Sequence, residues 1–261
     1  MYSFINFKYM IIFLSGATSG IGSSILQYFA NKKSSLIICS KSAVQLKKKR
    51  YKNNKNIYAY DVNFYDMKEL HSLMIKIKKK FKKIDVIINN AGGVDKNKTF
   101  LNTSYKDYVN IFNLNFFSSL VIIRNLYPLM HSSKIKQIIN ISSIAAKRPG
   151  YFNPGYAAAK SSLNNFTKYL ANFMAKKKIL VNTISAGVID TNGFRKNLFQ
   201  ISKITKQKLN KILQFEKNKI PLKKFGKPDD ILRLIKFLIY ENKWMTGSNI
   251  VIDGGKIETV N

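Results

Sequence analysis

Tyr156 and Lys160 are the residues of this sequence whose types and spacing most directly suggest chemistry. If the stretch Tyr156-Ala-Ala-Ala-Lys160 opens a helix, both side chains lie on one face, about one turn apart. A phenol has a reference pKa of about 10, and a lysine ammonium one turn away favours the phenolate and lowers that pKa. Ser143 lies upstream, where the apolar strand Gln137–Ile141 ends. A hydroxyl, an activated phenol and a cation at a strand end suit a carbonyl whose oxygen gains charge during reaction.

A strand, a glycine-rich turn and a helix near the start of the chain predict a dinucleotide-binding unit. The apolar run Met10–Ser15 is typical of a buried strand, and it leads into Ser-Gly-Ala-Thr-Ser-Gly-Ile-Gly at 15–22. An apolar helix over Ile21–Asn31 follows. Glycines in such a turn let the backbone approach a pyrophosphate, and the helix N-terminus faces it. Contacts to the cofactor are expected from Gly16, Ser19, Gly20, Ile21 and Gly22.

The end of the second strand bears on the choice between NADPH and NADH. An acidic residue at this position would bond both ribose hydroxyls and indicate NAD. The strand Leu36–Cys39 is instead followed by Ser40-Lys41-Ser42. A hydroxyl and an ammonium suit a 2′-phosphate, so Ser40 and Lys41 favour NADPH, with NADH as the alternative.

Two further strand ends carry polar residues that could face a cofactor. After the strand Ile57–Tyr60, Asp61 either accepts from the adenine amine or caps the helix that begins near Asp66. After the strand Ile84–Ile88 comes Asn89-Asn90-Ala91-Gly92-Gly93. Small residues and amides at this point let a cofactor approach, and an ordinary turn between a strand and a helix is the alternative.

Two predicted helices are apolar on more than one face. The segment Tyr105–Met130 is apolar around nearly its whole circumference, so it is expected to pack against its own sheet and against another subunit. Asn115 inside this segment is either a hydrogen-bonded core amide or a functional residue. The helix that continues after Lys160 has two apolar faces, which again indicates a subunit contact.

The remaining segments complete an alternation of strands and helices. Further strands are expected at Lys134–Ser143, Ile179–Ile184 and Asn249–Ile252, and further helices at Met67–Phe81 and Asp229–Tyr240. The polar, lysine-rich segment Asn192–Ile220 is typical of a helical lid over a site. The pattern predicts a single α/β domain over 1–261, a Rossmann-type doubly wound parallel sheet of about seven strands with helices on both faces.

The composition of the chain indicates which cellular compartment and which classes of partner to expect. The single cysteine, Cys39, excludes a disulfide framework and points to a reducing compartment. The net charge is +32, yet only five of the 45 basic residues are arginine, the residue that favours bidentate contacts to phosphates and bases. Nucleic acid is therefore not expected, and an acidic partner such as a carrier protein is. His71 and His131 have no neighbours at metal-ligand spacing, so no metal is expected.

No uninterrupted apolar run reaches the roughly 18 residues of a membrane span. Lys8 interrupts the apolar start of the chain, and a glycine turn follows where a signal peptide would have a cleavage site. We therefore expect a cytoplasmic protein that does not bind membranes.

With these residues in place, the sequence resembles the short-chain dehydrogenase/reductase family in its single-domain form. The glycine turn at 15–22 looks like the family's glycine motif, with Ser15 in place of the usual threonine. The resemblance continues to Gly255 through the adenine contact, the Asn-Asn-Ala-Gly motif, the C-terminal strand and a catalytic tetrad. The corresponding residues are Asp61-Val62, 89–92, 246–255, and Asn115, Ser143, Tyr156 and Lys160.

The resemblance implies a role for each of these residues. Tyr156 would be the general acid in reduction, Lys160 would lower its pKa and bond the nicotinamide ribose, and Ser143 would bond the substrate oxygen. Asn115 would hold a water that links Lys160 to solvent. Further cofactor contacts are implied for Asp61, Val62, Asn89, Ala91, Gly92, Val188, Ile189 and Thr191, besides Tyr156 and Lys160.

Two departures from the family pattern stand out. Ala186-Gly187 replaces the usual Pro-Gly after the sixth strand, which loosens that turn. Ser19 lacks the basic side chain that NADPH-dependent members often have at this position, so Lys41 alone supports NADPH.

Within the family, the sequence is most similar to 3-oxoacyl-(acyl-carrier-protein) reductases of fatty acid biosynthesis. Lys134 falls where these enzymes have a basic residue for the acidic carrier, and Asn172 falls where many have arginine. The spacing of Tyr156 and Lys160 argues against the divergent enoyl reductases. The resemblance implies NADPH-dependent reduction of a ketone, of 3-oxoacyl or polyketide type, by a homotetramer or dimer. The alternatives are an NAD-dependent dehydrogenase of a polyol, sugar or other hydroxy compound, and a non-catalytic basic binding protein.

Overall fold

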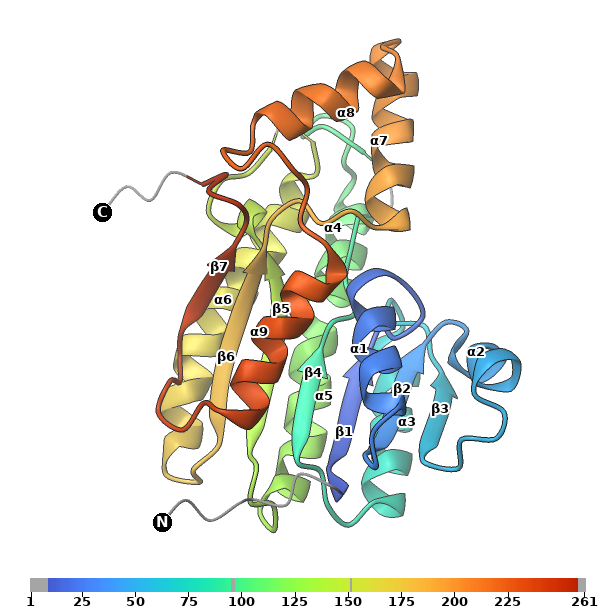
Figure 1. Cartoon of the computed structure of the whole chain (residues 1–261), viewed down its shortest axis with the longest axis vertical. Helices are drawn as coiled ribbons and strands as arrows, with labels where there is room; N and C mark the ends of the chain where they lie inside the picture. Colours follow the sequence, from blue (N-terminus) through green and yellow to red (C-terminus); the bar gives the residue numbers. More distant parts are fainter. Residues whose placement is uncertain (1–8, 95–96, 151, 258–261) are drawn as a thin grey trace.

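The computed structural model describes residues 9–94, 97–150 and 152–257, so Lys8 and the rest of the N-terminal stretch lie outside it. Its strands form one seven-stranded parallel sheet in the order β3-β2-β1-β4-β5-β6-β7 (Figure 1). The strands are β1 (Ile11–Ser15), β2 (Ser35–Ser40), β3 (Ile57–Asp61), β4 (Val86–Asn89), β5 (Gln137–Ser143), β6 (Leu180–Ala186) and β7 (Asn249–Ile252). The predicted doubly wound parallel sheet is confirmed.

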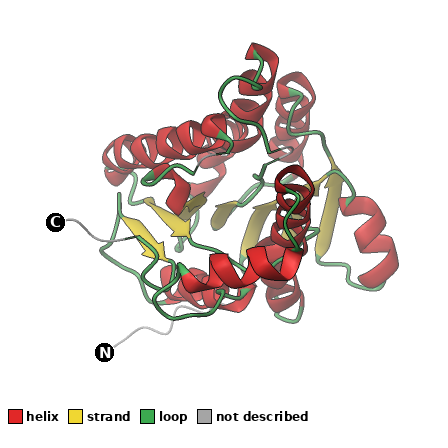
Figure 2. Ribbon diagram, turned by 90° about the horizontal axis from the view of Figure 1, so that it is seen from above, coloured by secondary structure: helices red, strands yellow, loops and turns green. Residues whose placement is uncertain are grey.

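Helices cover both faces of this sheet, as the view from above shows (Figure 2). On one face, α1 (Gly20–Ala30) packs beside α9 (Pro228–Tyr240). On the other face lie α3 (Met67–Lys80), α5 (Ser118–Leu126) and α6 (Pro154–Ala175). The alternation of side chains along each strand supplies both cores.

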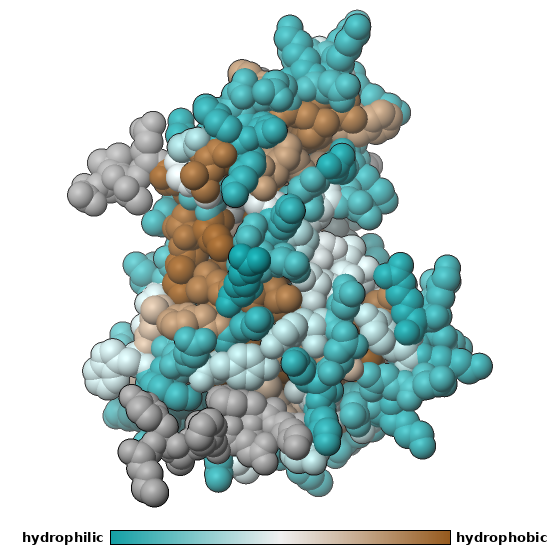
Figure 3. All heavy atoms as spheres, viewed as in Figure 1, coloured by the Kyte–Doolittle hydropathy of each residue, from teal (hydrophilic) through white to brown (hydrophobic). Residues whose placement is uncertain are grey.

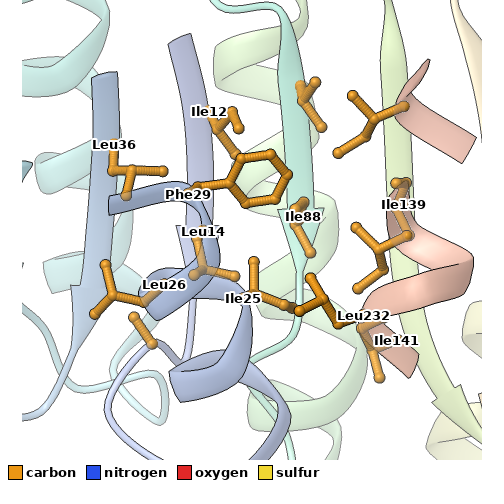
Figure 4. Packing of buried hydrophobic residues seen from close by; sticks show 14 of the residues in the cluster. Ile12, Leu14, Ile25, Leu26, Phe29, Leu36, Ile88, Ile139, Ile141 and Leu232 are labelled. Atoms are coloured by element: carbon orange, nitrogen blue, oxygen red, sulfur yellow. The ribbon is translucent and has the colours of Figure 1, made fainter. Parts of the chain in front are cut away.

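Strand β1 illustrates how one short apolar run serves two cores. Ile12 and Leu14 join the core under α1 and α9, where Phe29 of α1 also packs (Figure 4). Phe13, between them, points to the opposite core under α3, α5 and α6. All three β1 side chains are fully buried, which explains why the run is continuously apolar rather than alternating.

The segment 105–130 is not the single uninterrupted helix that the sequence predicts. It divides into α4 (Tyr105–Phe112), a π-helical turn η2 (Asn113–Phe117), α5 and a 3-10 turn η3 (Tyr127–Met130). Asn115 explains the π turn, because its Nδ2 donates to the Ile111 carbonyl 3.0 Å away and occupies an acceptor of the preceding helical turn. The N–H of Ser118 then reaches back five residues to the Asn113 carbonyl.

By length and average composition, segment 105–130 could span a membrane, although it contains no long uninterrupted apolar run. In the fold it runs between α3 and α6 against the sheet, the place of a core helix, and a third of its most apolar window is buried. The exposed remainder includes Tyr105, Val109 and Phe117.

A helix that the sequence pattern does not predict lies between β2 and β3. This helix, α2 (Ala43–Arg50), buries only Ala43 among its described residues and carries four basic residues in its last turn. No apolar periodicity marks it. Its N-terminus is stabilised by a residue distant in sequence, because the Val44 N–H donates to Asp61 Oδ1 at 2.9 Å.

The predicted helical segment 192–220 stands beyond the C-terminal ends of the strands, at the top of Figure 1. It forms two helices, α7 (Asn192–Thr205) and α8 (Leu209–Asn218), separated at Lys206, which has a left-handed φ of 56°. Both ends of the region are anchored by a bridge between Ile189 and Gly226. The segment is therefore held at its base and projects from the sheet.

Candidate functional site

The four predicted tetrad residues gather where β4 and β5 end. Ser143 is the last residue of β5, while Tyr156 and Lys160 lie in the first turns of α6. Gly92, in the loop after β4, lies against both Asn115 and Lys160. A Cβ atom added to Gly92 would come within 2.9 Å of Asn115 Oδ1 and of Lys160 Nζ. The structure therefore brings these predicted residues together around a position that has no room for a side chain.

Lys160 is buried, with 3% of its surface exposed, and its Nζ donates to the Ile141 carbonyl at 2.9 Å. Burial lowers the pKa of Lys160 to about 8. The Nζ atom is 5.9 Å from the centre of the Tyr156 ring. The ammonium is thus fixed beside the phenol by the end of β5.

The expected direction of the Tyr156 pKa is wrong for this structure. Burial raises the pKa of the Tyr156 phenol, and a hydrogen bond with the Ser143 side chain opposes that rise without reversing it. The physical reason is that the surroundings of both groups disfavour charge, so the phenolate and the ammonium are each destabilised. A raised pKa keeps Tyr156 protonated at neutral pH, the form that can donate a proton.

Asn115 has a structural role in the fold whether or not it also has a functional one. Its Oδ1 accepts from the Gly93 N–H at 2.9 Å, and its Nδ2 donates to the Gly93 carbonyl at 3.0 Å, besides the bond to Ile111. The side chain is fully buried. It therefore ties the loop after β4 to the π turn, and fixes Gly92 beside Lys160.

The glycine turn at 15–22 is shaped by close backbone contacts. Gly16 and Gly20 have positive φ angles of 69° and 54°. A Cβ atom on Gly22 would lie 1.9 Å from the Gly16 carbonyl oxygen, so only glycine fits. Ser15 Oγ accepts from the N–H groups of Asn90 and Ala91, each at 3.0 Å. The serine that replaces the family's threonine thus braces the loop after β4 through its hydroxyl, and its carbonyl also accepts from Asn90 Nδ2 at 3.2 Å.

The start of α1 fits an anionic group such as a dinucleotide pyrophosphate. The N-cap residue Ser19 makes no side-chain capping bond, and the first turn of this described helix has no acidic residue. Backbone N–H groups at a helix start carry partial positive charge and need acceptors. The uncapped helix start beside the narrow glycine turn therefore has the chemistry expected for phosphate binding.

Three residues expected near the adenosine occupy adjacent strand ends. Ser40 ends β2, and its buried hydroxyl has no hydrogen-bond partner among the described residues. Lys41 is exposed, with its Nζ 5.0 Å from the centre of the Tyr65 ring. The carboxylate of Asp61 accepts from Val44 and so stabilises α2, whereas Asp66 caps α3 itself. The alternative that Asp61 caps the helix near Asp66 is therefore wrong, since the helix it caps is α2.

Val62 and Ala91 are buried beside these loops, and Asn89 joins a polar network within the core. Asn89 Nδ2 donates to Asn140 Oδ1 at 2.8 Å, and Asn140 Nδ2 donates to Thr167 Oγ1 at 2.9 Å. Asn89 thereby links β4 through β5 to α6. Its own Oδ1 is buried without a partner among the described residues, so one acceptor at this strand end stays open.

In the loop after β6, where Ala186-Gly187 replaces the usual Pro-Gly, Gly187 packs closely against the end of β7. The Gly187 N–H donates to the Ile252 carbonyl at 2.9 Å, and a Cβ atom at Gly187 would lie 2.5 Å from Asp253 Cα. The Val188 carbonyl accepts from Gly226, and Ile189 forms the bridge at the base of 192–220. Thr191 caps α7 through its Oγ1, and its methyl group faces Gly20 across the glycine turn.

Two predicted residues for a carrier protein lie away from the tetrad. Lys134 precedes β5, at the opposite end of this strand from Ser143, and Asn172 lies near the end of α6, distant along the helix from Tyr156. Within one protomer, neither residue lies beside the phenol. The reason is the parallel sheet, in which all strands carry their C-terminal ends at one edge.

Three asparagines near the tetrad were not identified from the sequence. Asn97, Asn153 and Asn197 meet through their side-chain amides, although they are far apart along the chain. One local signal was available at Asn153. Asparagine before proline favours a turn, and asparagine tolerates the left-handed φ of 63° that Asn153 adopts. Nothing local marks the other two.

Comparisons with known proteins agree with this geometry. A family model described as enoyl-(acyl carrier protein) reductase matches residues 16–256. The 3-oxoacyl-(acyl-carrier-protein) reductase of Buchnera aphidicola (subsp. Baizongia pistaciae) is 32% identical over 94% of this chain and 96% of its own. The corresponding enzyme of Thermotoga maritima is 28% identical over 95% and 97%, and the 7alpha-hydroxysteroid dehydrogenase of Bacteroides fragilis is 27% identical over 95% of each.

Solved reductase structures are also similar to this chain over nearly its whole length. L-sorbose reductase of Gluconobacter frateurii, complexed with NADPH and L-sorbose, superposes with a TM-score of 0.85 at 25% identity, covering 97% of this chain and 98% of its own. The NADPH-dependent reductase YwfH of bacilysin biosynthesis also has a TM-score of 0.85 at 25% identity, covering 97% and 100%.

Proposed function

The chain belongs to the short-chain dehydrogenase/reductase family of oxidoreductases, and on this premise we propose that it reduces a ketone to a secondary alcohol with NADPH. The observation that carries the proposal is the grouping of Ser143, Tyr156 and the buried Lys160 at the edge of the sheet where the glycine turn also lies. This edge is where open α/β sheets bind their ligands.

The chain's own residues would supply binding and the proton. Ser143 and the Tyr156 hydroxyl bond the substrate oxygen, and Tyr156, protonated at neutral pH, donates its proton as that oxygen gains charge. The buried ammonium of Lys160 stabilises the phenolate left behind. When bound, the nicotinamide cofactor supplies the hydride. Backbone groups of 16–22 would hold its pyrophosphate, and the loop 188–191 would hold its amide end.

Two features support NADPH over NADH. Ser40 has a buried hydroxyl without a hydrogen-bond partner among the described residues, and Lys41, the next residue, carries an exposed ammonium over the Tyr65 ring. Two solved structures that superpose on this chain with a TM-score of 0.85 are an NADPH-dependent reductase and a reductase complexed with NADPH. The test is a pair of dissociation constants for NADPH and NADH, measured from cofactor fluorescence. NADPH binding at least tenfold tighter is expected from the extra phosphate contacts, and tighter NADH binding would contradict the choice.

The substrate we favour is a 3-oxoacyl thioester carried on an acyl carrier protein, as the names of the 27–32% identical relatives indicate. Such a role would place the enzyme in fatty acid or polyketide synthesis in the cytoplasm. The acidic carrier would be attracted to the net charge of +32. The helices of segment 192–220 would act as a lid that closes over the acyl chain.

A second candidate substrate is a sugar or polyol, because L-sorbose reductase superposes over nearly its whole length. One experiment separates the candidates. The protein is mixed with NADPH and, in parallel, a 3-oxoacyl thioester, a 2-enoyl thioester or a ketose, while cofactor absorbance is followed. Oxidation with the 3-oxoacyl thioester alone is expected; oxidation only with the enoyl thioester or the ketose would replace the favoured substrate.

The proposed proton donor is tested by Tyr156→Phe. This change removes one hydroxyl and keeps the ring, and it is expected to lower kcat about 10²-fold or more, because general acid catalysis is lost. NADPH affinity should change little. A Tyr156→Phe enzyme as active as the wild type would contradict the mechanism, whereas inactivity of both proteins would leave the substrate to be reconsidered.

We also propose that the protein is a homo-oligomer. Phe117, Tyr169 and Phe173 are 41%, 62% and 52% exposed, and Tyr169 and Phe173 stack with ring centres 6.3 Å apart along α6. Aromatic side chains grouped on the α4–α6 side suit burial against a second copy.

A further inference from the structure

Three asparagine side chains join three separate elements near the proposed proton donor. Asn97 lies in the loop between β4 and α4, Asn153 precedes α6, and Asn197 lies in α7. Asn97 Oδ1 accepts from Asn153 Nδ2 at 2.8 Å and from Asn197 Nδ2 at 2.9 Å. Asn97 Nδ2 donates to the Asn197 carbonyl at 3.2 Å. One amide group thus uses both of its acceptor positions and at least one donor to hold two partners.

The arm to Asn153 reaches the start of the catalytic helix. Asn153 has a φ of 63°, a conformation that is strained for a residue other than glycine. It is held there by bonds from its N–H to the Lys98 carbonyl at 2.8 Å and from its Nδ2 to Asn97. The Asn153 carbonyl accepts from the Tyr156 N–H at 3.1 Å. The conformation that Asn97 stabilises therefore sets the first turn from which the phenol projects.

The arm to Asn197 reaches the segment proposed as a lid. Within the described helix α7, the only buried side chain is Leu198, and Phe199 and Ile204 are exposed. Figure 3 shows apolar surface at the top of the molecule, where α7 and α8 lie in Figure 1. An element with so little buried apolar surface is weakly held by packing. The polar contacts of Asn197 with Asn97 join this weakly packed helix directly to the loop after β4.

We propose that Asn97 is a positioning residue that couples the closed position of α7 to the orientation of Tyr156. The inference rests on the proposed reaction, because Tyr156 and the lid have their roles there. Moving α7 away breaks the bonds to Asn197 and releases one side of the Asn97 amide, which then holds Asn153 less firmly. Asn97 touches neither reacting atom; it acts through Asn153 and Asn197.

Two substitutions separate the arms. Asn97→Ala removes the side-chain hydrogen bonds of both arms, to Asn153 and to Asn197. Asn197→Asp keeps the size of the side chain but presents a carboxylate oxygen to Asn97 Oδ1, so it removes the side-chain bond of the lid arm. The weaker bonds from Asn97 Nδ2 to the Asn197 carbonyl and to Gln200 Oε1 stay in place. A negative charge in the first turns of α7 does not disfavour the helix. Asn210→Asp, the same change at an exposed position of α8, is the matched control.

The first readout is independent of activity. Trypsin cleavage after Lys196 and Lys203, in α7, is expected to be several-fold faster in Asn97→Ala and Asn197→Asp than in the wild type or in Asn210→Asp, because lost hydrogen bonds raise the population of the open lid. Equal cleavage rates in all four proteins would show that Asn97 does not hold α7 in place, and would overturn the proposal even if no substrate had been found.

The second readout is the division between KM and kcat for the ketone. Asn197→Asp is expected to raise KM roughly tenfold with little change in kcat, since only lid closure is affected. Asn97→Ala should raise KM similarly and also lower kcat, because Tyr156 loses its support. The double variant should be no worse than Asn97→Ala. Additive effects, or an unchanged kcat in Asn97→Ala, would overturn the coupling, whereas an inactive wild type would reject the proposed function instead.

Discussion

At Tyr156, the cost of burying a phenolate exceeds the help that its neighbours give it. The hydrogen bond with Ser143 lowers the pKa of Tyr156, but burial raises it further. Lys160 experiences the same surroundings, which lower its pKa to about 8. The two charges and their spacing, taken alone, predict the opposite direction for the pKa of the phenol. Spacing along a helix tells nothing about how much water reaches either group.

Replacing Lys160 by methionine is expected to change how stability depends on pH. The pKa of Lys160 falls from 10.5 in the unfolded chain to about 8 in the folded one. Between these values the unfolded chain holds a proton that the folded chain has released, so stability rises with pH. The penalty of the buried ammonium is fully present below this window, where Lys160→Met should gain roughly 1–3 kcal/mol.

The measurement is urea unfolding of both proteins between pH 7 and pH 10. The stability difference should shrink as pH rises, since the penalty fades. Tyr156 does not interfere in this window, because its raised pKa affects stability only above its unfolded value of about 10. Lys168→Met, at an exposed position of the same helix, is the control. A Lys160→Met difference that stays constant with pH would contradict the interpretation.

Gly92→Ala is expected to disrupt the site while sparing the fold. The new methyl group would lie 2.9 Å from both Asn115 Oδ1 and Lys160 Nζ, so one of them must move. Displacing Lys160 by a fraction of an ångström should lower kcat/KM by roughly tenfold or more. Gly150→Ala is the matched control, because a methyl group there meets no atom within 4 Å of the described structure. Wild-type rates for Gly92→Ala would show that this contact is unimportant.

At the scale of the element, Asn115 converts part of a regular helix into a π turn. Its amide competes for the Ile111 carbonyl and also holds both backbone groups of Gly93. The apolar pattern around it predicts an uninterrupted helix because a helical wheel does not include side-chain bonds to another loop. The interruption is what places the loop after β4 beside Lys160.

Asn115→Ala is therefore expected to destabilise the protein by about 2–4 kcal/mol, since it empties a fully buried site and leaves part-buried backbone groups of Gly93 without their side-chain partner. Activity should fall with it, because the loop that carries Gly92 is no longer fixed. Asn113→Ala, in the same π turn, loses a single bond to the Tyr65 carbonyl and should cost only about 1 kcal/mol. Chemical denaturation compares the two, and equal losses would contradict the special role of Asn115.

At the scale of the whole molecule, the exposed aromatic side chains on η2 and α6 bear on assembly. Phe173→Glu is expected to shift the protein toward the monomer, because a carboxylate would be buried against a second copy. Sedimentation velocity measures the change. Phe237→Glu, at a 38% exposed position of α9 on the opposite face of the sheet, should leave the assembly unchanged. A wild type that sediments as a monomer at micromolar concentration would contradict the proposed oligomer.

The fold could be predicted from the sequence because its signals are local. Apolar runs such as Met10–Ser15, the glycines at 16, 20 and 22, and the Tyr156–Lys160 spacing each determine their own element, and the alternation of strands with helices determines the parallel sheet. Helix α2 was not predicted, because it has no such local signal. It lacks an apolar face, and Asp61, from another strand, stabilises its first turn.

The tertiary structure alone decided how these elements act on one another. Burial set the direction of the Tyr156 pKa, and the side-chain bonds of Asn115 set the π turn. The meeting of Asn97, Asn153 and Asn197 joins residues up to 100 positions apart. Desolvation and long-range hydrogen bonds depend on which segments come together in space. The sequence by itself therefore determined most of the elements and the candidate site residues, whereas the protonation and mutual support of these residues arise only in the folded chain.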